Sequence, residues 1–262
     1  MGRAEPRIMA HLVAGYPSRE ESLRIARGLA AGGASYLEVQ FPYSDPSADG
    51  PAIQAACDRA IKAGFTPDEG FGLAAEISGA AGLPVFIMGY AGTVYARGVR
   101  RFVSDARRAG AAGLIVPDLP PGNDEGLYRY GRELGVPAVP VTAPSVSEGR
   151  LARILEENPP YLYASLRTGI TGRVTDIKEA SGFLDLLRRK TGARILGGFG
   201  IRTRAQVEAL YPLVHALVVG SLFVEKIEDA VQTSPKMLYD IMYRSIEVLL
   251  NGNNEKEEET QP

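Results

Sequence analysis

Eight short apolar runs alternate with longer amphipathic segments along this chain, from residue 8 to about residue 230. Their short length and their content of β-branched residues favour strands, although periodicity alone does not exclude buried helix. The predicted strands are Ile8–Ala14, Ser35–Gln40, Val85–Tyr90, Leu114–Pro117, Ala138–Thr142, Leu162–Ser165, Arg194–Leu196 and Ala216–Val219.

The segments between these runs carry apolar residues at helical spacing. Ser18 is the predicted N-cap of the first helix, Glu21 completes a capping box, and Gly32–Gly33 ends the helix. Further helices are predicted near 52–63, 67–80, 94–109, 124–134, 147–157, 177–190, 203–211 and 222–231. A last helix, about 235–250, is expected to pack against the outside of the fold.

Eight strand-plus-helix units in one chain predict a closed parallel barrel, the (β/α)8 TIM barrel, as a single α/β domain over residues 1–250 with extra helices. An open, doubly wound sheet is the alternative. The polar clusters follow the carboxyl ends of the predicted strands, which favours the barrel. Residues 251–262 are charged and lack apolar anchors, so we expect a disordered tail there.

Composition narrows the classes of function. The net charge of −2 gives no sign of a nucleic-acid or membrane partner. A lone cysteine, Cys57, excludes an intramolecular disulfide and a cysteine-rich zinc site. The start of the chain lacks the apolar stretch of a secretory signal, and the apolar segment Leu213–Val224 is too short to cross a bilayer. We therefore expect a cytoplasmic protein.

The second predicted strand alternates with period two, so Tyr36, Glu38 and Gln40 should face the barrel interior. Glu38 is then a carboxylate near the top of an apolar core, where it needs a partner or a proton. One interpretation is a general acid or base. A structural salt bridge is the other, and the burial argument does not choose between them.

A shaped loop follows this strand, from Phe41 to Pro51, with two Pro-containing turns and an Asp-Gly step. Asp49 is a second carboxylate, and the loop can fold back so that Glu38 and Asp49 share one pocket. Asp45 and Asp49 are alternatively turn formers or helix caps, the commoner role of an isolated Asp.

Glycine clusters follow the last two predicted strands, at Gly198–Gly200 and Gly220–Ser221, each just before a predicted helix. Glycine lets backbone N–H groups approach an anion, and a helix N-terminus favours negative charge. Gly169–Gly172 could close over the same end. These clusters predict a phosphorylated small molecule, with ordinary glycine turns as the alternative.

The motif from Glu38 to Gln54, EVQFPYSDPSADGPAIQ, resembles the signature of the tryptophan synthase α family. The resemblance covers roughly residues 8 to 245, with further motifs in family order. These motifs are Ala14–Pro17, Asp118–Pro121, Arg167–Gly172, Gly197–Ile201 and Gly220–Ser221. The long motif after the second strand is specific, whereas the glycine motifs alone are weak.

The resemblance implies retro-aldol cleavage of indole-3-glycerol phosphate to indole and glyceraldehyde 3-phosphate. Glu38 matches the catalytic acid/base, Asp49 matches the carboxylate that holds the indole N–H, and Tyr163 matches a tyrosine beside the substrate, although it could equally be a core residue. The implied substrate-binding residues at the phosphate end are Gly172, Gly198, Gly200, Gly220 and Ser221. No metal or organic cofactor is implied.

The resemblance also implies a partner, a pyridoxal-phosphate β subunit in an α2β2 complex. Pro42, Asp45 and the loop after the sixth strand would lie at that interface. Two alternatives remain within the family: a stand-alone lyase, and a weakly catalytic barrel that activates a β subunit. A different phosphate-binding barrel, such as a sugar-phosphate isomerase, is disfavoured by the pairing of Glu38 with Asp49.

Four positions depart from the family pattern: His11, Tyr16, Gln40 and Gly92. Gln40 stands in place of glycine, and its amide is expected to bond Glu38 or to crowd the substrate. His11 stands in place of an apolar aromatic residue, and a neutral, hydrogen-bonded imidazole is favoured over a catalytic one. Tyr16 replaces an aspartate, and Gly92 replaces an asparagine that would face the partner.

Overall fold

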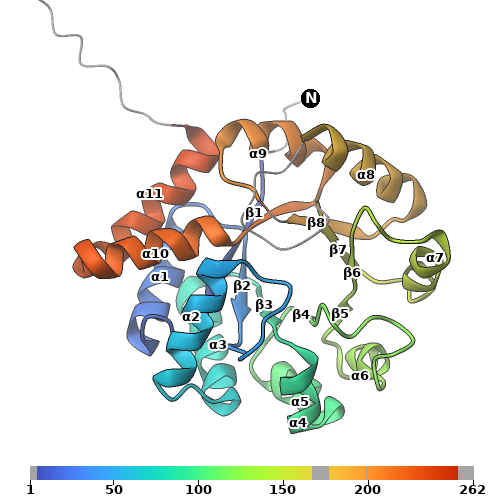
Figure 1. Ribbon diagram of the computed structural model, residues 1–262, viewed down its shortest axis with the longest axis horizontal. Coiled ribbons are helices and arrows are strands. Elements are labelled where there is room, and N and C mark those ends of the chain that lie inside the picture. Colours follow the sequence, from blue (N-terminus) through green and yellow to red (C-terminus); the bar gives the residue numbers. More distant parts are fainter. Residues whose placement is uncertain (1–4, 167–176, 199, 253–262) are drawn as a thin grey trace, which may run out of the picture.

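The computed structural model describes residues 5–166, 177–198 and 200–252. Nine parallel strand segments form one sheet that winds into a barrel, with helices around its outside (Figure 1). The segments are β1 (Ile8–Val13), β2 (Tyr36–Gln40), β3 (Val85–Met88), β4 (Gly113–Ile115), β5 (Ala138–Val139), β6 (Val141–Thr142), β7 (Tyr161–Ser165), β8 (Arg194–Gly198) and β9 (Ala216–Val219).

The strand order confirms a barrel of eight strands. The sheet runs β5-β4-β3-β2-β1-β9-β8-β7-β6, which is sequence order taken around a ring. Its two ends, β5 and β6, are halves of one predicted strand, split at Pro140 because proline has no N–H for the ladder. The Pro140 carbonyl still accepts from the Tyr163 backbone N–H at 2.9 Å. A doubly wound sheet would reverse strand order midway, and this sheet does not.

The helices follow the predicted segments closely. Their bounds are α1 (Arg19–Ala31), α2 (Pro51–Lys62), α3 (Pro67–Ala81), α4 (Ala91–Arg97), α5 (Val99–Arg108), α6 (Leu127–Leu134), α7 (Glu148–Glu156), α8 (Ile177–Lys190), α9 (Arg204–Leu210), α10 (Ser221–Thr233) and α11 (Leu238–Asn251). The single helix predicted over 94–109 was wrong. It is two helices, because Gly98 between them has φ 85°, outside the helical region.

Two apolar layers confirm the predicted alternation along β2. Leu37 and Val39 belong to the core between the strands and the outer helices. Tyr36 packs against a separate cluster that fills the barrel, whose buried members include Phe86 and Leu196. Inward side chains of successive strands therefore meet along the barrel axis, and those nearest the carboxyl ends are available for a site.

The last helix packs on the outer ring, as predicted. α11 crosses α1 so closely that a Cβ on Gly28 would stand 2.5 Å from the Tyr239 carbonyl oxygen. Asn251, the first residue of the tail predicted over 251–262, is the last residue of α11, and the tail from residue 253 onward lies outside the described residues. Among the helices that the structure describes, none is long and apolar enough to span a membrane.

Candidate active site

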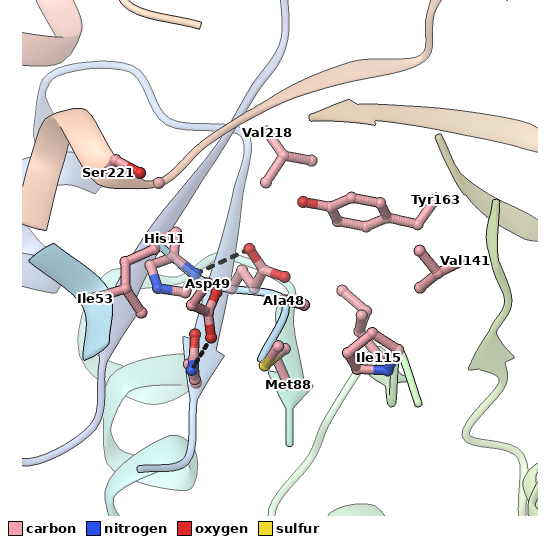
Figure 2. Close-up of a pocket in the computed structure, with 14 residues that line it drawn as sticks. His11, Ala48, Asp49, Ile53, Met88, Ile115, Val141, Tyr163, Val218 and Ser221 are labelled. Carbon is pink, nitrogen blue, oxygen red and sulfur yellow. Dashed lines mark hydrogen bonds and ion pairs between the residues drawn. The ribbon is translucent and has the colours of Figure 1, made fainter. Parts of the chain in front are cut away.

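A pocket opens at the carboxyl end of the barrel, where function is expected in this fold. Both predicted carboxylates, Glu38 and Asp49, line it. In Figure 2, His11, Asp49 and Ile53 lie on one side of the pocket, and Tyr163 and Val141 lie on the other. The lining residues are His11, Glu38, Gln40, Ala48, Asp49, Ile53, Met88, Ile115, Pro117, Val141, Tyr163, Val218, Gly220 and Ser221.

Glu38 projects from β2 into this pocket and is 4 % exposed. Its Oε2 is 3.0 Å from Nδ1 of His11, which stands beside it on β1 in register with Glu38. His11 is equally buried, at 4 % exposed. The hydrogen bond expected for His11 is confirmed, and its partner is the candidate acid/base.

Asp49 reaches the pocket from the loop after β2. Its Oδ2 accepts from the Tyr90 hydroxyl and from Gln40 Nε2, both at 2.7 Å. Gly50, not Asp49, is the N-cap of α2, so the Asp49 carboxylate does not cap this helix. Gln54 Nε2 donates to the Asp49 carbonyl at 2.8 Å and holds the loop against α2.

Gln40 does not bond Glu38, which was one of its two expected roles. Its amide nitrogen donates to Asp49 and lies 3.5 Å from the Cys57 sulfur. The reason is geometric: the loop after β2 returns Asp49 to the end of that strand, within hydrogen-bond distance of the Gln40 amide. Gln40 is fully buried and fills pocket space where a glycine would leave room.

Burial and charge act against each other in this pocket. Burial raises the pKa of Asp49, while His11, Tyr90 and Gln40 oppose that rise. Burial alone would lower the pKa of His11, but the hydrogen bond and charge of Glu38, with the charge of Asp49, raise it above its ordinary value. The two carboxylates that face the imidazole therefore favour its protonated form over the neutral form expected from the sequence.

Tyr163, from β7, forms the opposite wall and is 7 % exposed. Burial raises the pKa of its hydroxyl, which therefore stays protonated. Ile115, Val141 and Met88 complete an apolar wall beside it. One side of the pocket is thus apolar, and the other side carries carboxylates that accept hydrogen bonds.

The predicted phosphate end contains two kinds of glycine. Gly220 is the N-cap of α10, and Ser221 is the first residue of that helix; both line the pocket. Gly200 has φ 78°, a conformation that favours glycine. A Cβ on Gly198 would stand 2.5 Å from the Tyr163 hydroxyl oxygen, so this glycine makes room for that ring. Gly172 lies outside the described residues.

Sequence reasoning missed Tyr90, which bonds Asp49 from the end of β3 and stacks on Tyr43 with ring centroids 5.2 Å apart. Tyr43 also explains Gly92, because its hydroxyl occupies the space that a side chain there would need. No sequence pattern joins Tyr90 to Asp49, because 41 residues separate them. Tyr16 donates to Glu228 of α10 and ties the first loop to that helix.

Among residues 5–166, 177–198 and 200–252, no group of three His, Cys, Asp or Glu residues is arranged to hold a metal ion. The strand order and the pocket lining define a class: a (β/α)8 barrel whose pocket pairs two acidic side chains, the residue type used in acid–base chemistry, with an apolar wall.

The comparisons with known proteins are specific. A family model described as tryptophan synthase alpha chain matches residues 1–249. The tryptophan synthase alpha chain of Helicobacter hepaticus is 37 % identical over 247 residues, 92 % of each chain. That of Caulobacter sp. is 33 % identical, over 92 % of this chain and 88 % of the relative.

Solved structures agree in fold. Tryptophan synthase from Mycobacterium tuberculosis matches with a TM-score of 0.85 and 27 % identity, over 95 % of this chain and 92 % of that one. The Pyrococcus furiosus tryptophan synthase complex matches with a TM-score of 0.85 and 29 % identity, over 94 % and 98 %. This chain belongs to the tryptophan synthase alpha chain family. The reaction characteristic of that family is the lyase cleavage of indole-3-glycerol phosphate in tryptophan biosynthesis.

Proposed function

We propose that this chain cleaves indole-3-glycerol phosphate by a retro-aldol reaction in which Glu38 and Asp49 are the catalytic residues. The observation that carries the proposal is the convergence of these two buried carboxylates on one pocket with an apolar far wall. Indole is apolar and carries one N–H, and the glycerol phosphate is polar. The substrate therefore has an apolar part and a polar part, as the pocket does.

Glu38 is the proposed acid/base. It delivers a proton to C3 of the indole ring, and it then accepts the proton of the glycerol hydroxyl next to that carbon. The carbon–carbon bond breaks, its electrons return to the ring, and the hydroxyl carbon becomes the aldehyde of glyceraldehyde 3-phosphate. One carboxyl group serves both steps because the two positions are neighbours on the substrate.

Asp49 is the proposed acceptor of the indole N–H. Positive charge develops on the ring when C3 is protonated, so a fixed anion at the nitrogen stabilises the transition state more than the ground state. Tyr90 and Gln40 both donate to Oδ2, which orients the carboxylate. Oδ1 is then the oxygen assigned to the substrate.

The phosphate is assigned to the glycine end, with Gly200, Gly220 and Ser221 as binding residues and Gly172 as a further one by family resemblance. The N-terminus of α10 supplies N–H groups and a favourable partial charge. Tyr163 is proposed to contact the substrate from the apolar wall. Gly198 is proposed to act in substrate binding by giving Tyr163 its position.

The family needs no cofactor of its own, and we extend this to the present chain, because the indole ring itself accepts the proton and returns the electrons. Pyridoxal phosphate is assigned to a β subunit, which would receive the indole. The Pyrococcus relative is named as an α2β2 complex, which supports the same heterotetramer here. The Pro42–Asp45 segment is the proposed contact, and the location is proposed to be cytoplasmic.

One assay tests these proposals. Purified chain is incubated with indole-3-glycerol phosphate, with and without a tryptophan synthase β subunit, and indole is measured. We expect release that the β subunit stimulates. Release that the β subunit does not change would favour a stand-alone lyase. No release of indole, together with stimulation of the β reaction, would favour the weakly catalytic activator. This is the strongest alternative, because Gln40 occupies pocket space and bonds the carboxylate of Asp49.

A further inference from the structure

Among the described residues that line the pocket, His11 is the one side chain able to carry a positive charge. The other ionisable members are Glu38, Asp49 and Tyr163. Two buried carboxylates without a countercharge would be costly, and a phosphorylated substrate would add to that cost. The imidazole therefore has an electrostatic part to play in this pocket besides filling space.

The contact is specific to one carboxylate. Nδ1 of His11 lies 3.0 Å from Oε2 of Glu38, within reach for direct proton transfer, and both groups are almost fully buried. Nε2 of His11 is buried with no hydrogen-bond partner among the described residues. The side chain is thus fixed by its hydrogen bond to Glu38 and by its place beside Gly220, where an added Cβ would stand 3.6 Å from the imidazole ring. It has no second polar anchor among the described residues.

We infer that His11 is a positioning residue for the cleavage reaction: its imidazolium holds the proton that Glu38 delivers to indole C3. This inference rests on the proposed function. The proton passes from Nδ1 to Glu38 Oε2 and then to C3, which leaves a neutral imidazole. The glycerol hydroxyl proton returns through Glu38 to His11 as the carbon–carbon bond breaks, so the pair ends the cycle as it began.

The surroundings support one proton shared by this pair. Glu38 from β2 and Asp49 from the next loop face the imidazole and raise its pKa. Burial raises the pKa of the Tyr90 and Tyr163 hydroxyls and raises that of the Cys57 thiol of α2 to about 12, so these groups stay neutral. From α10 the pocket receives Ser221, which does not titrate.

The first test is the pH profile of kcat for indole release in wild type and in His11→Gln, which keeps a donor but cannot store a proton. In wild type, the alkaline limb reports loss of the shared proton. The variant lacks the imidazole that holds the proton in wild type, so we expect the alkaline limb to move to lower pH by at least about one unit, because a carboxyl group ordinarily loses its proton at lower pH than an imidazole does. His215→Gln, at the other end of the barrel, is the matched control and should leave the limb in place.

A merely structural role for His11 would lower kcat at every pH without moving the limb, and that result overturns the inference.

The second test needs no turnover. The chain has two histidines, so an NMR titration with ring-labelled histidine resolves both, and His11→Gln assigns them. We expect His11 to titrate above about 6.5, the ordinary value for histidine, and Glu38→Gln to lower its pKa while that of His215 stays unchanged.

A His11 signal that titrates no higher than that of His215, or that ignores Glu38→Gln, also overturns the inference. The two proposals fail separately. If wild type releases no indole, the cleavage function fails, while the NMR titration still decides whether the proton-holding pair exists. If wild type releases indole and the alkaline limb does not move in His11→Gln, the inference about His11 fails alone.

Discussion

The only two histidines of this chain lie at opposite ends of the barrel, and their surroundings give them opposite electrostatic properties. His11, near the carboxyl end, bonds Glu38, and the pKa of its imidazole is raised. His215, just before β9 at the amino end, bonds the Tyr36 hydroxyl at 2.8 Å. Burial lowers its pKa, and the charges of Arg7 and Arg194 lower it further.

The difference shows that the charged neighbours at each end of this barrel decide which way the pKa of a histidine moves. At the carboxyl end, buried carboxylates converge on an apolar pocket. At the amino end, Tyr36, Tyr161 and His215 pack as rings, with Arg194 donating to Tyr161 at 3.0 Å. Tyr36 and Tyr161 pack against the apolar cluster that fills the barrel, whereas the carboxyl end gathers the ionisable groups of the proposed reaction.

The largest effect is expected from Glu38→Gln, which should lower kcat at least about 100-fold, because it removes the proposed acid/base. Tyr36→Phe is the matched control: it lies on the same strand and the same inward face but at the amino end. Its kcat should stay near that of wild type. Steady-state indole release measures both, and similar losses in the two variants would erase the contrast between the ends.

Gly200→Glu should raise KM for indole-3-glycerol phosphate at least about tenfold, because a carboxylate placed beside the proposed phosphate site repels the substrate. Gly200→Ala separates backbone strain at φ 78° from charge. It should change KM less than Gly200→Glu does. Equal KM values for both variants would show that strain, and not charge, governs this position.

Gly198→Ala should lower kcat/KM several-fold and destabilise the protein by about 1–3 kcal/mol, the usual cost of overpacking a core. The new Cβ would stand 2.5 Å from the Tyr163 hydroxyl oxygen and would displace the pocket wall. Gly192→Ala is the control, since no heavy atom lies within 4 Å of a Cβ there. Denaturant unfolding and indole release give both quantities, and parallel behaviour of the two variants would contradict the assignment.

The smallest effect concerns stability against pH. Because folding raises the pKa of His11, its protonation stabilises the folded protein at pH below the pKa that His11 has in the unfolded chain. This stability is lost as pH rises through the pKa of His11 in the folded protein. Folding lowers the pKa of His215, so the folded protein loses stability as pH falls and this histidine must be protonated. Relative to wild type, His11→Gln should therefore lose most stability at acid pH, and His215→Gln should gain there. Unfolding curves between about pH 5 and pH 8 test the opposite slopes, because the ordinary histidine pKa of about 6.5 lies in that window.

The fold was largely predictable because its signal is local. All eight strand runs appear as strands, with the fifth split at Pro140, and the helix over 177–190 has the predicted bounds. The errors occurred at helix boundaries, where a single residue can end or start a helix. Gly98 divides a predicted helix, and α6 begins at Leu127 instead of the predicted residue 124. Hydrophobic periodicity does not register such a local change in backbone conformation.

The site was predictable only in part. Inward alternation placed Glu38, and the loop motif placed Asp49, because both inferences depend on short sequence distances. The partners of these carboxylates come from elsewhere: His11 is 27 residues from Glu38, and Tyr90 is 41 residues from Asp49. No periodicity links such positions. The expected partner of Gln40 was wrong for another reason, because strand alternation does not show how the loop after β2 returns Asp49 to the Gln40 amide.

The amino-acid sequence by itself determined the eight strand–helix units, the face that each inward residue occupies and the family. These features depend only on the types and spacing of residues that are close together in the chain. The closed barrel alone decided which side chains meet. It set His11 against Glu38 and Gln40 against Asp49, and it gave two identical imidazoles opposite tendencies to hold a proton. The physical reason is that a pKa depends on charges and burial within a few ångströms, and in this fold those neighbours are brought together by strands far apart in the chain.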